Sequence, residues 1–178
     1  MTIYLCSISF PHSLSLSPSL PTPSPPCLLP QKVIPSFPTR RAAMNREAQV
    51  LERVNNPNLF NSHNGMTVTA VGDGKAQGVL EVSSTSMNPH GIVHGGCLYT
   101  LADTVAGSAV AASCGGPCVT VSGTLEFLRP ATGEAIYCTA SPKKLGSTIC
   151  TMEVELTDQA HKVVATGTFI FMLVQPKV

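Results

Sequence analysis

The sequence predicts an α+β fold in which a curved antiparallel sheet wraps around one central helix. Residues 97–113 are rich in Ala, Leu and Val, carry a single charge and contain no proline, which is typical of a helix buried on nearly every side. Two strand-like segments precede this helix and four follow it, each bounded by turn residues. One sheet that covers one helix is the simplest packing for that order of elements.

Each element has its own sequence signal. Apolar residues at helical spacing predict a short amphipathic helix over residues 46–54, and the Asn-Asn-Pro-Asn run at 55–58 ends it. Strands at 66–71 and 76–82 are joined by Gly72-Asp73-Gly74, a hairpin signal. A loop of small and polar residues covers 83–96. The remaining strands are predicted at 119–127, 135–141, 148–156 and 163–174, with turns at 130–133, 143–146 and 158–160. The open sheet edge favours pairing with a second subunit.

The composition excludes several classes of protein. The chain has 178 residues, 12% of them charged, and a net charge of +1, so nucleic-acid binding is not expected. No apolar run approaches the roughly 18–20 residues that span a bilayer, so no membrane partner is expected. The seven cysteines include no Cys-x-x-Cys pair, which argues against a metal site, and most lie inside apolar segments, which favours a reducing compartment over a disulfide scaffold.

Residues 1–43 differ from the rest of the chain. Nine of the fifteen prolines and eight serines lie within the first 39 residues, and no acidic residue precedes Glu47. Such a leader is expected to be disordered, to be an organellar transit peptide, or not to be translated if Met44 is the true start. The folded domain is therefore predicted at residues 44–178, in the cytoplasm or, if the leader is a transit peptide, in an organelle.

One charged residue stands out in the apolar central helix. Asp103 is the only carboxylate between Glu81 and Glu126. A carboxylate on a buried helix costs several kcal/mol unless it is paired or used. Asp103 lies on an exposed strip of the helix, hydrogen-bonds locally to Thr104, or has a chemical role, and its apolar neighbours favour the last interpretation.

The residues just before that helix favour an anion-stabilising site. His94-Gly95-Gly96 leaves the first backbone N–H groups of the helix unobstructed, at the positive end of its dipole. Gly95 and Asp103 are eight residues apart, or about 12 Å along a helix. Both cannot act on one carbonyl within one chain, so they either serve different purposes or a second chain supplies the Asp103 of each site. The second alternative predicts a homodimer with two shared sites.

Three motifs follow one another along the chain. They are Asn88, Gly91, His94, Gly95 and Gly96, then Leu101 and Asp103, then Phe127, Leu128, Arg129 and Pro130. Together they resemble the hotdog-fold acyl-CoA thioesterases, specifically the phenylacetic-acid-degradation (PaaI-like) family, and the resemblance covers residues 46–176. It implies a hotdog fold, a dimer or tetramer, and hydrolysis of acyl-CoA thioesters to a free acid and CoA.

The resemblance also implies roles for individual residues. The Gly95 N–H, assisted by the Asn88 side chain, would stabilise the oxyanion of the thioester carbonyl. Asp103 of the partner subunit would act as general base on water or as nucleophile. His94 would shape the loop or contact the thioester, or would only hydrogen-bond to backbone. Thr120 would orient the water, or is an ordinary strand threonine.

The phosphates of coenzyme A need cations and hydrogen-bond donors. The candidates are Arg129, Lys143 and Lys144, with Gly146 and Ser147 at the start of a strand. No metal or redox cofactor is expected.

Two other functions remain open: a hotdog hydratase or dehydratase, and a non-catalytic acyl-CoA-binding protein. The acyl specificity is not predicted, although Leu59, Phe60, Leu98 and Leu101 are candidates for the acyl pocket.

Overall fold

The structure is a computed structural model that describes residues 40–174, with only the backbone described for residues 40–43. The predicted leader lies outside the described residues except for its last four, which belong to the first helix. That helix, α1 (Arg40–Val54), therefore begins six residues earlier than the sequence predicts and ends where predicted. A single turn of helix, α2 (Phe60–His63), and a 3₁₀ turn, η1 (Ser84–Ser86), were not predicted.

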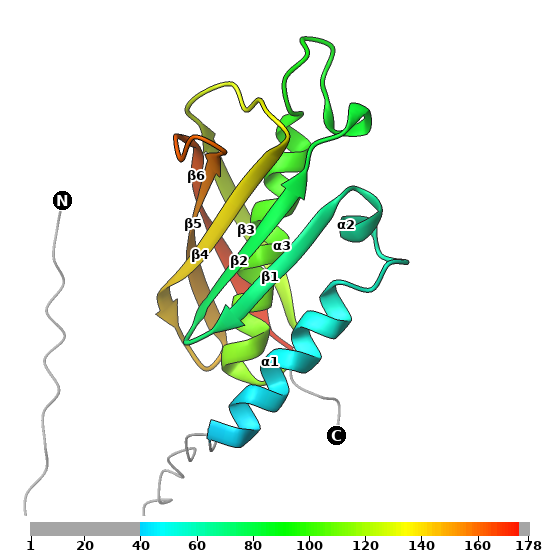
Figure 1. Ribbon diagram of the computed structural model, residues 1–178. Coiled ribbons are helices and arrows are strands. Elements are labelled where there is room, and N and C mark those ends of the chain that lie inside the picture. The colour runs from blue at the N-terminus through cyan, green and yellow to red at the C-terminus, as the bar shows by residue number, and fades with distance from the viewer. Residues whose placement is uncertain (1–39, 175–178) are drawn as a thin grey trace, which may run out of the picture. The chain divides into compact units, whose positions relative to one another are not determined.

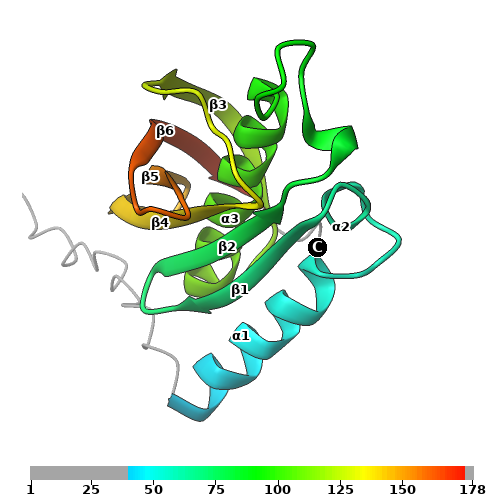
Figure 2. The same cartoon turned by 45° about the horizontal axis from the view of Figure 1, so that its top comes forward.

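Six antiparallel strands form one sheet that curves around the long helix α3 (Gly95–Cys114), as Figures 1 and 2 show. The strand order across the sheet is β1-β2-β4-β5-β6-β3, so β1 and β3 form its edges. The predicted sheet around a central helix is thus confirmed. The strands are β1 (Met66–Gly72), β2 (Lys75–Glu81), β3 (Cys118–Phe127), β4 (Ala135–Leu145), β5 (Ile149–Asp158) and β6 (Val163–Leu173).

The predicted hairpin between β1 and β2 is present. Gly72 pairs with Lys75 across a two-residue turn. Asp73 and Gly74 both have positive φ, 49° and 80°, as a type I′ turn requires. Asp tolerates this conformation and Gly adopts it freely, so the Asp-Gly pair determines where the hairpin closes.

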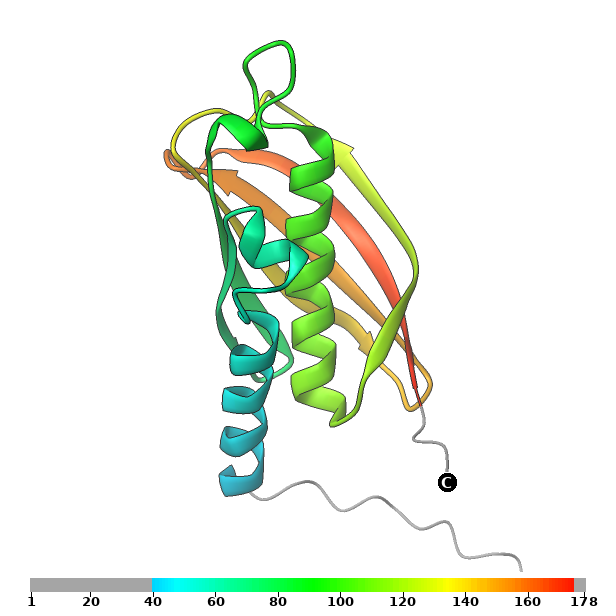
Figure 3. The ribbon, with the colours of Figure 1, turned by 90° about the vertical axis from the view of Figure 1, so that its right-hand side faces the viewer.

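One side of α3 fills the concave face of the sheet, and α1 lies beside it on the other side, running in the opposite direction (Figure 3). Leu101, Val105 and Ala109 are fully buried, whereas Tyr99 is exposed and Asp103 and Gly107 are partly exposed. The prediction that α3 is buried on nearly every side is therefore wrong. Among the described helices α3 alone is long and apolar enough to cross a membrane by length and composition, but half of it is buried in the protein as a core helix.

Strand β4 is longer than the sequence predicts. It continues through Pro142, Lys143 and Lys144 to Leu145, where a turn is predicted. A bulge at Pro142/Lys144 admits the proline into the ladder, and the Lys143 ammonium lies 3.0 Å from the Glu153 carboxylate on β5. This pairing outweighs the turn signal of the Lys-Lys-Leu-Gly run.

Candidate active site

The loop before α3 is held by backbone hydrogen bonds and by the side chain of Asn88. The Asn88 amide oxygen accepts from the His90 N–H at 2.9 Å and from the Ile92 N–H at 3.4 Å. Gly91 completes the turn with φ of +73°. The His94 N–H then donates to the Ser86 carbonyl at 2.8 Å. The loop therefore delivers the chain to the start of α3 in one defined position.

The first three backbone N–H groups of α3 differ in their hydrogen bonding. The Gly96 N–H donates to the His94 ring and the Cys97 N–H to the His94 carbonyl, whereas the Gly95 N–H has no acceptor among residues 40–174. The Asn88 Nδ2 likewise has no acceptor within these residues. Asn88 and Gly95 both line one hollow of about 320 Å³ at the start of the helix, where its dipole is positive.

His94 caps α3. Its Nδ1 accepts from the Gly96 N–H at 2.8 Å, which satisfies one of the amides that a helix start leaves without an intrahelical partner. Of the two roles left open by the sequence, this contact corresponds to hydrogen bonding with backbone. The His94 side chain also lines a separate hollow, with Phe60 and Thr100, and not the one shared by Asn88 and Gly95.

Asp103 is half-buried and bonded to a strand side chain. The Thr120 hydroxyl donates to its Oδ1 at 2.8 Å. Burial raises the pKa of Asp103 above the ordinary carboxyl value, and the Thr120 hydrogen bond lowers it in part. No partner for Oδ2 is found in the described part of the chain. The Thr120 hydrogen bond therefore fixes the orientation of the Asp103 carboxylate, burial makes it more basic, and Oδ2 is left without a partner among the described residues.

A β-bulge aims Thr120 at Asp103. Thr120 pairs with Phe171, whose ring is in the core, so the Thr120 side chain points to the helix side of the sheet. The register then shifts between Thr120 and Ser122, and Gly123 pairs with the next core residue, Phe169. Bulges of this kind often re-aim a side chain next to a site.

Asp103 and Gly95 do not share a pocket within one chain. Asp103 and Thr120 line a groove of about 550 Å³ between α1 and α3. The Gly95 hollow is a different one, and eight helical residues place it about 12 Å away along the axis. Within one chain, the hydrogen-bond donors Asn88 and Gly95 are therefore separated from the carboxylate of Asp103.

The predicted coenzyme A residues fall at two ends of the sheet. Arg129 lines the Gly95 hollow, where its Nη1 donates to the Val163 carbonyl at 2.6 Å. Lys143 and Lys144 end β4, and Gly146 and Ser147 form the turn to β5, near the C-terminal end of α3. Within one chain the end of β4 and the turn to β5 lie at the opposite end of α3 from its first residue (Figure 1).

The candidate acyl-pocket residues also separate. Leu59 lines the Asp103 groove and Leu98 the Gly95 hollow. Phe60 lies in the His94 hollow, and Leu101 is fully buried in the core. The sequence did not point to Arg46 and Arg53, which line the Asp103 groove from α1, because only the packing of α1 against α3 brings them there.

The described cysteines are packing groups. Cys114 and Cys150 have their sulfurs 3.6 Å apart, and all five cysteines described are free thiols. Burial raises the pKa of Cys114 and Cys138 to about 12 and that of Cys118 to about 11, so these thiols stay protonated and weakly nucleophilic at neutral pH. Within residues 40–174, no three His, Cys, Asp or Glu side chains gather as metal ligands would.

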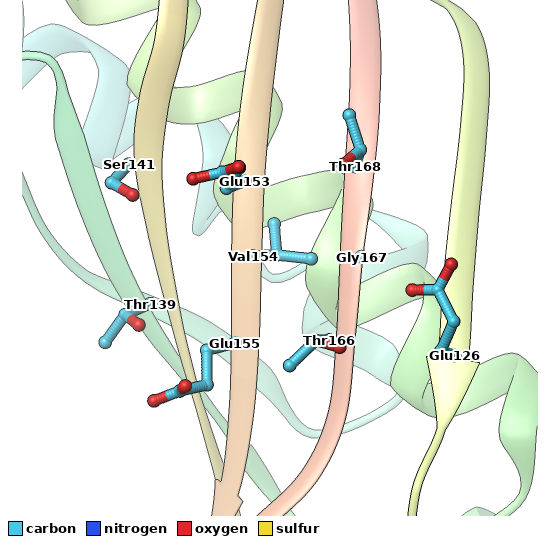
Figure 4. A pocket seen from close by; sticks show the side chains of 9 residues that line it. All are labelled: Glu126, Thr139, Ser141, Glu153, Val154, Glu155, Thr166, Gly167 and Thr168. Carbon is cyan, nitrogen blue, oxygen red and sulfur yellow. The ribbon is translucent and has the colours of Figure 1, made fainter.

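The outer face of the sheet holds another hollow, of about 480 Å³ (Figure 4). Hydroxyl and carboxylate side chains line most of it, together with Val154 and Gly167. Neither the Asn88–Gly95 pair nor the Asp103–Thr120 pair lines this hollow. The side chains around it are Glu126, Thr139, Ser141, Glu153, Glu155, Thr166 and Thr168.

Comparison with known proteins identifies the family. The profile of the Thioesterase superfamily matches residues 90–165. Acyl-coenzyme A thioesterase 13 of Homo sapiens is 34% identical over 107 residues, which cover 57% of this chain and 75% of that protein. The acyl-coenzyme A thioesterase PaaI of Escherichia coli is 31% identical over 105 residues, covering 57% and 72%. The matched stretches span between 62% and 81% of the length of the curated relatives.

Solved structures agree on the fold. The E. coli PaaI structure superposes with a TM-score of 0.67 at 24% identity, covering 76% of this chain and 95% of that one. A Streptococcus mutans protein bound to acetyl CoA superposes with a TM-score of 0.59 at 23% identity, covering 64% and 91%. With the fold shared and the sequence relatives above 30% identity, the chain belongs to the hotdog-fold thioesterase superfamily and, within it, to the PaaI-like acyl-CoA thioesterases, a family of thioester hydrolases.

Proposed function

We propose that this chain hydrolyses acyl-CoA thioesters at two sites shared across a homodimer. Each site would combine the Gly95 N–H and Asn88 amide of one subunit with Asp103 and Thr120 of the other. The observation that carries the proposal is the separation within one chain: the free donors and the basic carboxylate line different pockets about 12 Å apart.

The edge strand β3 supports the dimer. Val119 and Val121 on this strand are 47% and 58% exposed, and Phe127 at its end is 56% exposed. An edge strand with exposed apolar side chains is a template for pairing with another chain. A two-fold axis beside β3 would bring the α3 helices of the two subunits together in opposite directions, so the Gly95 end of one approaches Asp103 of the other.

The chemistry follows from these groups. Asp103 removes a proton from water, and the oxygen of that water attacks the thioester carbonyl carbon. The resulting oxyanion accepts hydrogen bonds from the Gly95 N–H and the Asn88 Nδ2. The intermediate then collapses, the C–S bond breaks, and the CoA thiolate takes the proton from Asp103. We infer the general-base role because burial raises the pKa of Asp103 and Thr120 holds only one of its oxygens.

Arg129 lies in the Gly95 hollow and would bind a phosphate of coenzyme A. Lys143, Lys144, Gly146 and Ser147 would contribute from the partner subunit, since they lie at the opposite end of α3. The acetyl CoA complex of the S. mutans neighbour supports a CoA ligand for the fold.

Complementation between two inactive variants tests the shared site. Asp103→Asn removes the base, and Gly95→Pro removes the donor N–H. When the two are co-expressed or refolded together, half of the dimers are mixed, and each mixed dimer has one intact site of two, so about a quarter of the wild-type activity should return. No recovery from a mixed dimer confirmed by mass would refute the shared site.

Thiol release from a panel of aryl and aliphatic acyl-CoAs tests the activity itself. A wild-type protein that binds these compounds and releases no CoA would support the non-catalytic alternative. Hydration of an enoyl-CoA without thiol release would support a hydratase.

A further inference from the structure

The groove that ends at Asp103 has a cationic wall that the reaction does not use. Its α1 side carries Arg46, Gln49 and Arg53, and its inner surface carries Val50 and Val54. The spacing of these residues places them on one face of α1. Among the described residues that line the groove, Asp103 is the only carboxylate against two arginines, so their side chains give it a net positive charge.

The two arginines differ in how they are held. Arg46 Nη1 donates to the Ala112 carbonyl at 3.4 Å, and its guanidinium lies over Gly115, where a Cβ would come within 2.9 Å of it. Arg46 therefore also stabilises the C-terminal end of α3 and keeps its other N–H groups available. Arg53 makes no hydrogen bond or ion pair within the described part of the chain.

The rest of the groove suits an apolar chain. Val50, Val54, Leu59 and Phe171 supply its apolar surface. Gly107 lies one helical turn beyond Asp103 and contributes no side chain, since a Cβ there would come within 3.3 Å of the Phe171 ring. The groove is therefore open next to the carboxylate that the proposed function uses.

The length of the groove follows from the two helices. Ala112, which Arg46 contacts, is nine residues beyond Asp103, or about 13 Å along α3. Arg53 is seven residues beyond Arg46, or about 10 Å along α1, and α1 runs in the opposite direction to α3 (Figure 3), so Arg53 is nearer than Arg46 to the level of Asp103. A chain that starts at Asp103 thus passes Arg53 before it reaches Arg46.

We propose, resting on the proposed function, that this groove selects acyl groups that end in a carboxylate: CoA thioesters of dicarboxylic acids. The thioester lies at Asp103, the methylene chain lies on the apolar surface, and Arg53 or Arg46 binds the terminal carboxylate. An arginine binds a carboxylate through two parallel hydrogen bonds, so the arginines act as specificity-determining residues.

Matched pairs of substrates test this proposal. Adipyl-CoA is compared with hexanoyl-CoA, and suberyl-CoA with octanoyl-CoA, by thiol release. Wild type should show a higher kcat/KM for the dicarboxylic member of each pair, and Arg53→Gln should reduce that preference by about tenfold or more. Lys75→Gln, which removes an exposed positive charge on β2, should leave the preference unchanged. Arg46→Gln is interpreted only if its Tm is unchanged, since Arg46 also holds the end of α3.

Two kinetic results would overturn the proposal: equal rates for both members of each pair, or a KM raised equally for all substrates by Arg53→Gln. The second result would mean that Arg53 binds the coenzyme A part. Calorimetry with non-hydrolysable thioether analogues separates this proposal from the proposed function. A protein that releases no thiol yet binds the carboxylate-ended analogue more tightly, with the difference lost in Arg53→Gln, supports the groove and contradicts hydrolysis. Equal binding of the two analogues contradicts the groove.

Discussion

The loop that precedes Gly95 is held by local hydrogen bonds to its backbone N–H groups, whereas Asp103 on α3 is held by a side chain from strand β3. The 88–94 loop is anchored by the Asn88 turn and by the bond from the His94 N–H to Ser86, and it leaves a free main-chain N–H. Asp103 depends instead on Thr120 and on burial against the core.

This difference determines which substitutions can remove the Gly95 donor and which can remove the Asp103 carboxylate. A main-chain donor is unaffected by most substitutions and is removed only by proline. A half-buried carboxylate can be neutralised without a change in shape, and its pKa responds to its neighbours. The two halves can therefore be tested separately.

Removal of the carboxylate is expected to have the largest effect. Asp103→Asn keeps an acceptor for the Thr120 hydroxyl but cannot take a proton, so kcat should fall by about 10²–10⁴-fold. Steady-state thiol release measures this, with circular dichroism as the control for folding. Turnover within a few-fold of wild type would remove Asp103 from the mechanism.

The same variant has a predictable effect on stability. Burial raises the pKa of Asp103 in the folded state, so at neutral pH the charged carboxylate destabilises the folded state relative to the unfolded chain. Asp103→Asn should therefore keep or raise the Tm at pH 7. The advantage should shrink as the pH falls through the folded-state pKa, because the wild-type carboxyl then becomes neutral.

Asp103 and the helix around it were predictable because a lone charge in an apolar helix stands out at the level of composition. The sheet wrapped around α3 was predictable for a similar reason, since strand periodicity and turn residues are local signals. The Thr120 contact was not, because it depends on the bulge that sets the register of β3 against β6. The approach of Arg46 and Arg53 to the groove depends in turn on how α1 packs against α3, which no local pattern encodes.

Loss of the Gly95 N–H is expected to have the next largest effect on turnover. Gly95→Pro removes the N–H, and proline is tolerated at the first helical position, where His94 already has an extended ψ of 133°. The kcat should fall by about 10²–10³-fold, as for the loss of one oxyanion donor.

Gly95→Ala is the matched control for this loss. It keeps the N–H but places a Cβ 3.2 Å from the Phe127 ring, as the proline does. If alanine lowers kcat as much as proline, crowding against Phe127 and not the lost donor explains the effect.

Loss of the Thr120 hydroxyl should have a smaller effect that depends on pH. Thr120→Val removes the hydrogen bond that lowers the pKa of Asp103, so that pKa should rise further. The acid limb of the kcat/KM profile should then move to higher pH, with about a tenfold loss or less at neutral pH. Thr124→Val, on the opposite face of β3, is the control and should leave the profile in place.

The smallest effect is expected from the cap of α3. His94→Ala removes the acceptor for the Gly96 N–H and should destabilise the protein by about 1 kcal/mol, whereas His94→Asn retains an acceptor at the same position. Denaturant unfolding measures the stability of both variants, and thiol release measures their activity. Since a cap acts on the position of the loop, Asn should restore both quantities together. If Asn restores stability but not turnover, the His94 ring contacts the substrate as well, and the loop supplies a side chain to the chemistry in addition to its backbone donor.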